Sequence, residues 1–234
     1  MIGKQAFNNK LFTALLLLLS INATSVLAAN ATSELKPDEI LHKATNELLV
    51  VINRDREKIK KNPDYVYDVV KQYLIPHVDF VSAARWVLGK YERTASKEEK
   101  IQFILEFRTL MIRFYATALR EYLINNENEI KKEMIRYYPV TLKEGATQVI
   151  VRSEIVPTGS KKVPVNFHMH LKKGKWKVFD VSVDGVSIVT TYQTSFSSQI
   201  RKKGLSNVIA ALKKRNAGLK EPETGTTGAE QKAN

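Results

Sequence analysis

The chain has 234 residues, 44% of them hydrophobic, and its 37 Lys and Arg against 24 Asp and Glu give a net charge of +13 at neutral pH. This length and composition predict one globular domain, large enough for a real core or an internal cavity. The absence of cysteine excludes disulfides, thiolate metal sites and a lipid anchor on an N-terminal cysteine.

The N-terminal segment is predicted to be a targeting signal. Lys4 and Lys10 precede a short apolar run at 11–19, and Val26-Leu27-Ala28 fits a cleavage site. We therefore predict a signal peptide over residues 1–28, cleaved after Ala28, with a retained N-terminal anchor as the alternative. Cleavage lowers the net charge from +13 to +11. A basic exported protein is expected to meet anionic lipid surfaces or acidic proteins rather than nucleic acid.

The first half of the mature chain has helical periodicity. Pro37-Asp38-Glu39 is typical of a first helical turn, Gly89 of a helix end, and Ser96 with Glu99 of a capping box. Apolar residues cover several sides of the longest predicted helix, which dense core packing and a ligand cavity explain about equally well. The predicted helices span residues 37–60, 65–74, 78–88 and 97–124.

After residue 126 the apolar residues alternate, which predicts antiparallel strands at 130–138, 148–156, 163–171 and from 176 to the turn at Asp184-Gly185. Helices follow at 187–203 and 206–215. We expect a flexible N-terminus at 29–36, one domain at 37–216 and a disordered tail at 217–234. Helices, then a meander, then helices predict an α+β fold with helices stacked on one face of a curved sheet.

Enzymatic interpretations find little support in the sequence. His168 and His170 lie on one face of a strand, but no third metal ligand is evident, so a solvated pair is favoured. Asp180 and Asp184 are spaced as same-face neighbours, and Asp180 has the parity of Trp176 and Val178. A structural hydrogen-bonding role for Asp180 is favoured over that of a general base.

Several segments resemble the MlaC (toluene-tolerance) family of periplasmic phospholipid-binding proteins, and the similarity spans residues 37–216. The segments are YLIPHVDF (73–80), ARWVLGKY (84–91), EFRTL (106–110), YATALREY (115–122), WKVFDVSVDGVS (176–187) and the stretch from Ser195-Phe196 to Ile200-Arg201.

The resemblance implies an open cone like that of nuclear transport factor 2, in which helices wrap a curved antiparallel sheet of four to five strands around an apolar pocket. It also implies a monomeric periplasmic carrier of phospholipid, without cofactor, metal or catalytic activity. Such a carrier would move lipid between an outer-membrane lipoprotein–porin complex and an inner-membrane ABC transporter with an MCE-domain subunit, maintaining outer-membrane lipid asymmetry. An enzyme acting on a lipid or hydrophobic small molecule, and a basic adhesion module, are the alternatives.

A carrier of this kind must enclose both lipid tails. A diacyl lipid has roughly 30 methylenes at about 0.8 kcal/mol each, so their exposure to water would cost on the order of 20 kcal/mol. A dry, filled core is the alternative for each lining residue, and a tryptophan at Val151 or Val165 would distinguish the two. The predicted lipid-binding residues are Met111, Phe114, Tyr115, Val149, Val151, Ile155, Val163, Val165, Phe167 and Met169.

The positive charge suggests where such a carrier would dock. A carrier that meets two membrane systems must bind weakly and leave, which charge–charge contacts allow. The predicted docking residues lie near the two C-terminal helices: Arg201, Lys202, Lys203, Lys213, Lys214 and Arg215.

Overall fold

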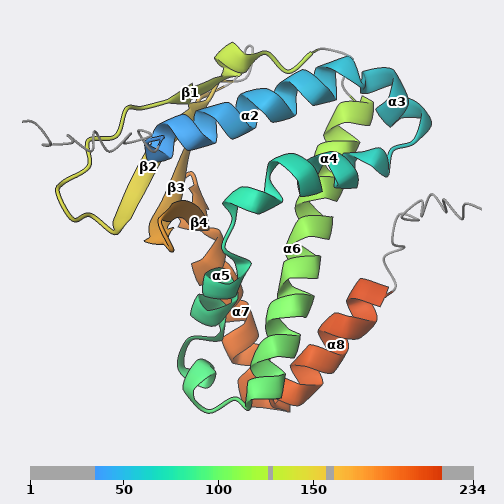
Figure 1. The fold of residues 1–234 in the computed structure, drawn as a ribbon. Helices are drawn as coiled ribbons and strands as arrows, with labels where there is room; N and C mark the ends of the chain where they lie inside the picture. Colours follow the sequence, from blue (N-terminus) through green and yellow to red (C-terminus); the bar gives the residue numbers. More distant parts are fainter. Residues whose placement is uncertain (1–34, 126–128, 157–160, 218–234) are drawn as a thin grey trace, which may run out of the picture. The chain divides into compact units, whose positions relative to one another are not determined.

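A computed structural model describes residues 35–125, 129–156 and 161–217, which form an α+β fold (Figure 1). The predicted fold class is therefore confirmed. The α-helices are α2 (Pro37–Arg54), α3 (Arg56–Lys61), α4 (Tyr65–Tyr73), α5 (Phe80–Leu88), α6 (Lys97–Asn125), α7 (Ile188–Lys203) and α8 (Leu205–Ala217). Short 3-10 helices are η1 (Ile75–His77), η2 (Gly89–Arg93) and η3 (Lys132–Met134). The strands are β1 (Ile135–Tyr137), β2 (Gln148–Ile155), β3 (Val163–Lys172), β4 (Lys175–Val183) and β5 (Val186–Ser187).

The predicted signal peptide, its cleavage site and the chain after Ala217 lie outside the described residues. Among the residues that are described, no helix combines the length and apolar character needed to cross a membrane.

Two helix predictions need correction. The helix expected at 37–60 is interrupted at Asp55, whose carboxylate accepts hydrogen bonds from the Arg54 guanidinium and the Tyr65 hydroxyl. The helix expected from residue 78 begins at Phe80 instead, because Val78 forms a parallel bridge with Val178 at the edge of β4. The predicted Ser96–Glu99 capping box is present, with reciprocal distances of 3.0 and 3.1 Å.

The sheet is an antiparallel meander in the order β1-β2-β3-β4-β5. Two tight turns close its last hairpins, and both central residues of each have positive φ: 51° and 72° at Lys173-Gly174, 50° and 81° at Asp184-Gly185. Such turns match the right-handed twist of the strands they join. The first strand is shorter than the predicted 130–138, because residues 132–134 form η3.

A bulge at Phe179 changes the sidedness of β4. His168 pairs with Asp180 and the next residue, Met169, pairs with Val178, so Phe179 is the extra residue. Asp180 therefore lies on the opposite face from Trp176 and Val178, and the parity predicted for it is wrong. The predicted apolar side of β2 and β3 is correct, since Val151 stands opposite Phe167.

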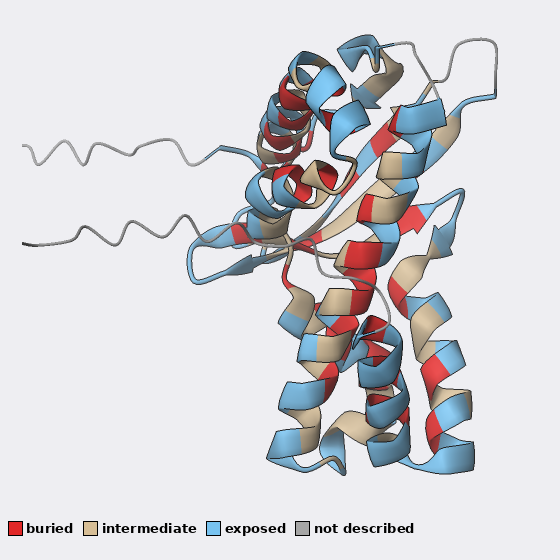
Figure 2. Ribbon diagram, turned by 90° about the vertical axis from the view of Figure 1, so that its right-hand side faces the viewer, coloured by how far each residue is buried: buried red, intermediate tan, exposed pale blue. Residues whose placement is uncertain are grey.

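The buried apolar side chains form three separate clusters, and each helix turns its buried side towards its neighbours (Figure 2). The sheet cluster contains Leu41, Val140, Val151, Met169, Trp176 and Val178. The α2–α4 cluster contains Leu48, Val51, Ile52, Ile59, Val66, Val69, Val70, Ala116 and Leu123. The α5–α8 cluster contains Ala83, Ala84, Val87, Leu88, Phe103, Phe107, Leu110, Met111, Val189, Phe196, Ile200, Val208, Ile209 and Leu212. Small domains usually have one contiguous core, so this division is a distinctive property of the fold.

Candidate functional site

One face of the sheet carries a row of apolar side chains that runs from the core to solvent. We call it the apolar strip, and it consists of Ile155, Val163, Val165, Phe167, Val181 and Val183. The ladder places them on one side, because Ile155 pairs with Val163, Val165 with Val183, and Phe167 with Val181. At its inner end Phe167 and Val181 pack against the sheet cluster. At its outer end Ile155 and Val183 are 37% and 41% exposed.

Val165 has a special position within the apolar strip. It is only 6% exposed, yet it belongs to none of the three clusters of buried side chains in the described part of the chain. By contrast, Val151 and Met169 on the same face are fully buried within the sheet cluster. Val165 is thus buried, but not within the sheet cluster.

Two aromatic residues of α6 also present apolar surface to solvent. Phe114 and Tyr115 are 50% and 43% exposed and contact each other edge to face, with ring centroids 5.2 Å apart. Partial burial, together with the nearby Tyr192 and Asp180, raises the pKa of Tyr115 to about 12. Tyr115 thus lies near Tyr192 of α7 and Asp180 of β4.

Seven of the ten predicted lining residues lie on one face of β2 and β3, with Val149 half-buried beside the sheet cluster. Met111 packs in the α5–α8 cluster, one helical turn before Phe114 and Tyr115 on α6. The sequence could identify the face of each strand, since a strand has two faces. It could not assign α6 residues to particular neighbours, because that helix contributes to two clusters.

The opposite face of the sheet is polar and tied to the start of α5. The Asp79 carboxylate caps α5 by accepting from the Ser82 backbone N–H at 3.1 Å. It also accepts from the Ser82 hydroxyl at 2.8 Å and from Lys172 Nζ at 2.5 Å, and contacts His170 Nε2 at 3.0 Å. Burial alone would raise the pKa of Asp79, but the bonds from Lys172 and Ser82 outweigh it and hold that pKa well below its usual value.

The predicted solvated histidine pair is instead partly buried and bonded. His168 Nε2 lies 2.9 Å from the Ser182 hydroxyl, and the His170 ring packs on Phe179. No group of three or more potential metal ligands occurs in the described ranges.

Asp180 has the structural hydrogen-bonding role favoured by the sequence. One carboxylate oxygen accepts from the backbone N–H of Val181 and Val189, at 2.8 and 3.0 Å, and the other from the Ser187 hydroxyl at 2.6 Å. These bonds fix the turn from β4 into α7. Both oxygens are engaged in holding the fold.

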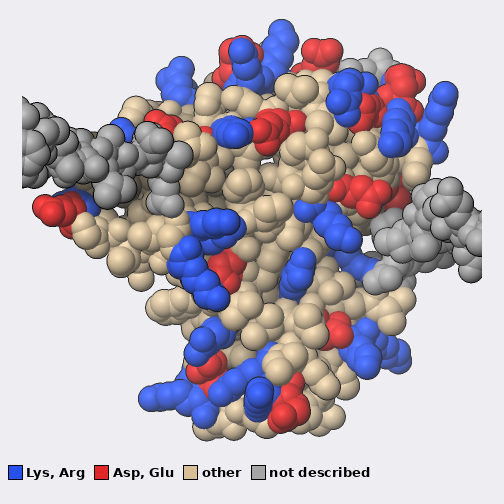
Figure 3. Space-filling model, in the orientation of Figure 1, with Lys and Arg blue, Asp and Glu red and all other residues tan. Residues whose placement is uncertain are grey.

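The predicted docking cations are all exposed, but they occupy two places. Arg201, Lys202 and Lys203 form the last turn of α7, whereas residues 213–215 lie near the far end of α8. Since α8 is 13 residues long, roughly 10–15 Å of helix separates the two groups. Figure 3 shows acidic side chains among the basic ones over the lower helices, so this view has no patch of a single sign.

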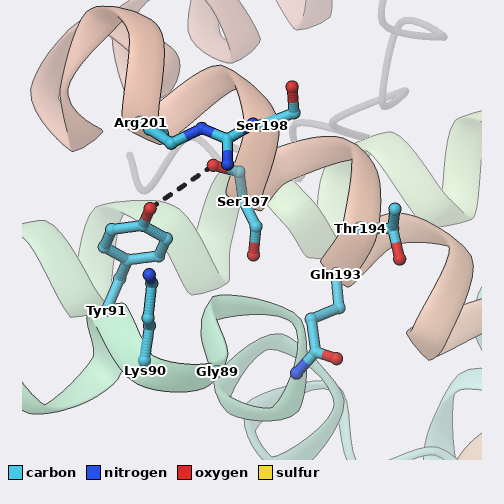
Figure 4. A pocket seen from close by; sticks show the side chains of 8 residues that line it. All are labelled: Gly89, Lys90, Tyr91, Gln193, Thr194, Ser197, Ser198 and Arg201. Atoms are coloured by element: carbon cyan, nitrogen blue, oxygen red, sulfur yellow. Dashed lines mark hydrogen bonds between the residues drawn. The ribbon is translucent and has the colours of Figure 1, made fainter.

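A polar hollow that the sequence analysis missed lies between η2 and α7 (Figure 4). We call it the η2–α7 hollow; its volume is about 600 Å³. It is lined by Gly89, Lys90, Tyr91, Gln193, Thr194, Ser197, Ser198 and Arg201. Its two walls are more than 100 residues apart in sequence and carry residue types that are common on protein surfaces. Only one lining residue, Gly89, was assigned a structural role from the sequence, as the end of a helix.

Comparison with known proteins places these features in a family. The family model described as "MlaC protein" matches residues 42–214. A Haemophilus influenzae protein named "Intermembrane phospholipid transport system binding protein MlaC" is 27% identical over 191 residues, covering 80% of this chain and 85% of that protein. The Pseudomonas putida "Toluene tolerance protein ttg2D" is also 27% identical, over 72% of this chain and 74% of its own length.

A solved structure shows the same arrangement of helices and sheet. It is a phospholipid-binding protein from Ralstonia solanacearum, in complex with a phospholipid. The TM-score is 0.66 at 26% identity, and the alignment covers 79% of this chain and 99% of that one.

Proposed function

We infer that this chain, which belongs to the MlaC family, is a phospholipid carrier that encloses the acyl tails of its cargo. The observation that carries this inference is the apolar strip, which leads from the sheet cluster to exposed Ile155 and Val183. The lipid-bound relative of the same fold and the name of the Haemophilus relative support it. Phospholipid is the cargo in this proposal, and no cofactor or catalytic step is involved.

The proposed lipid lies along the apolar strip, with its tails between the sheet and the Phe114–Tyr115 side of α6. Burying roughly 30 methylenes there removes an exposure cost on the order of 20 kcal/mol. This gain is far larger than the free-energy cost of leaving the outer end of the apolar strip exposed in the empty protein. The exposed end of the strip would leave the head group in water. Half-buried Phe167 and Val181 would meet the tail ends.

The head group is expected to contribute little to selectivity, because most of the binding energy comes from the tails. Protein purified without added lipid should carry phospholipid, and native mass spectrometry should detect phosphatidylethanolamine and phosphatidylglycerol in proportion to their supply. Competition between the two lipids should give similar affinities. A preference above about a hundredfold, some 2.7 kcal/mol, would contradict recognition through the tails, and protein without any lipid would contradict the carrier function.

We further propose that the carrier is exported to the periplasm, after cleavage behind Ala28, and works there as a monomer. Its partners would be the inner-membrane MCE-domain transporter and the outer-membrane lipoprotein–porin complex, and its activity would maintain outer-membrane lipid asymmetry. The basic charge of the chain and the name of the intermembrane transport relative support this location.

Docking is expected to depend on the cations of α7 and α8. Reversing Lys202 and Lys203 to Glu, or Lys213 and Lys214, should slow lipid transfer to the reconstituted transporter by about tenfold at low salt, through loss of electrostatic steering. Bound lipid should stay unchanged, and the difference should shrink as salt rises. The control reverses Lys61 and Lys71, exposed on α3 and α4. Equal slowing in the control, or lower lipid occupancy in the docking variants, would show that the docking surface lies elsewhere.

A further inference from the structure

We propose that the η2–α7 hollow binds a phosphorylated polar group between Lys90 and Arg201. The hollow contains none of the residues of the apolar strip, so the inference goes beyond the binding of acyl tails. Its volume of about 600 Å³ lies within the range of roughly 300–1,000 Å³ typical of small-molecule sites.

The charge of the hollow favours an anion. Its lining includes two cations, Lys90 and Arg201, and no carboxylate. Within the described residues neither cation forms an ion pair; the Lys90 ammonium lies 5.3 Å from the centre of the Tyr91 ring. The neighbouring Glu92 is paired with Arg85, at 2.9 Å. The positive charge is therefore not neutralised by the residues that the structure describes.

A hydroxyl donor completes the set. Thr191 and Thr194 of α7 donate to carbonyl oxygens four residues earlier, at 2.7 and 3.0 Å, as helical hydroxyls often do. The Ser197 hydroxyl makes no such bond within the described chain, and Figure 4 shows it pointing from α7 towards η2. The Ser198 hydroxyl points away in the same view. Ser197 is thus a donor without an internal acceptor beside two cations.

The walls of the hollow are fixed by hydrogen bonds that join its two sides. The Gln193 side-chain amide donates to the Trp86 carbonyl at 2.7 Å, and the Tyr91 hydroxyl to the Ser197 carbonyl at 3.4 Å. Gly89 permits this close approach, since it has φ of 54° and a Cβ there would lie 2.8 Å from Gln193 Nε2. A preformed site loses little entropy on binding its ligand.

The donors match the chemistry of a phosphoryl group. Arginine offers a planar fork for two phosphate oxygens, lysine a point charge and serine one hydrogen bond. The hollow has more room than phosphate alone requires, so a small polar group attached to the phosphate also fits. The same chemistry is presented by a glycerophospholipid head group and by free phosphate.

Titration followed by amide NMR tests the site, using inorganic phosphate and glycerol 3-phosphate at constant ionic strength. Saturable shifts are expected at the amides of Lys90, Ser197 and Arg201. The Lys90→Ala/Arg201→Ala variant should lose at least about tenfold in affinity for either ligand. The Lys202→Ala/Lys203→Ala variant removes the same charge next to the hollow and should change affinity less than twofold. Tighter binding of glycerol 3-phosphate identifies the lipid head group as the source, and equal binding identifies free phosphate.

Two results would overturn the proposal. One is an equal loss of affinity in both double variants, and the other is a set of shifts spread over exposed lysines without saturation. Ser197→Ala guards against misfolding of the double variant, since it removes a single hydroxyl from a half-buried side chain and should still weaken binding severalfold. Copurifying phospholipid should be unchanged in every variant, which separates this site from the carrier function.

Discussion

Val165→Trp is expected to abolish copurifying phospholipid while the protein stays folded. Val165 is 6% exposed in the middle of the apolar strip, between Val163 and Phe167, and lies outside the three packed clusters, so an indole there would occupy the space proposed for the tails. Val151→Trp should behave differently, because Val151 is fully buried within the sheet cluster. Overpacking there is expected to cost about 1–3 kcal/mol. Each kcal/mol should lower the melting temperature by about 2–4 °C, and the lipid should be retained.

Native mass spectrometry and calorimetry on the same preparations measure both quantities. Val50→Trp is the matched control, since Val50 is 64% exposed on α2 and a tryptophan there should change neither lipid occupancy nor stability. If Val165→Trp keeps its lipid and melts early, the tails lie elsewhere, and the proposed lining residues are wrong even if the carrier function holds.

Replacing Asp79 is expected to give the largest loss of stability. Its buried carboxylate accepts from Ser82 and Lys172 and contacts His170, so Asp79→Ala leaves several donors without an acceptor. Loss of the α5 cap costs about 1 kcal/mol, and unpaired buried donors about 1–3 kcal/mol more. Asp79→Asn retains a good capping residue, so it should recover the contribution of the α5 cap but not that of the bonds from Lys172 and His170. Urea unfolding of the three proteins measures the difference, and equal stability of Asp79→Ala and wild type would contradict this role.

The same carboxylate makes stability depend on pH. Its pKa in the folded protein lies below the usual value near 3.8, so the charged form is favoured by folding. Its contribution is fully present above pH 4 to 5 and is lost as the pH falls through the lower, folded pKa. Unfolding curves should show wild type losing its advantage over Asp79→Asn in that acidic window. A constant difference down to pH 2 would mean that the contribution of Asp79 does not depend on its charge.

Sequence periodicity was sufficient to predict the sheet face but not its local irregularities. The alternation in β2 and β3 placed Val151, Val165 and Phe167 on one side, because the pleat allows only two sides. The bulge at Phe179 was not predicted, although the adjacent apolar residues Val178 and Phe179 interrupt the alternation before Asp180. The break at Asp55 depends on the Tyr65 hydroxyl, ten residues away, which helical periodicity does not report.

The sequence could predict the parts of the candidate site that depend on a single strand, but not the parts formed by segments far apart in the chain. Strip residues came from single strands and could be identified by alternation. The neighbours of Met111 could not be predicted, because α6 is apolar on several sides and only its packing with α5, α7 and α8 shows which residues Met111 contacts. The η2–α7 hollow depends on residues 89 and 193 meeting in space, and its lysine, serine and glutamine residues have no sequence pattern that distinguishes them from solvated surface.

Two helices connect the three separate clusters of buried side chains. Helix α2 contributes to the sheet cluster and the α2–α4 cluster, and α6 to the α2–α4 and α5–α8 clusters (Figure 1). If the proposed tails lie between these clusters, we expect small rotations of the two helices to change the volume available to them while each cluster stays packed. The carrier would then be expected to bind acyl chains of different length and unsaturation with similar affinity.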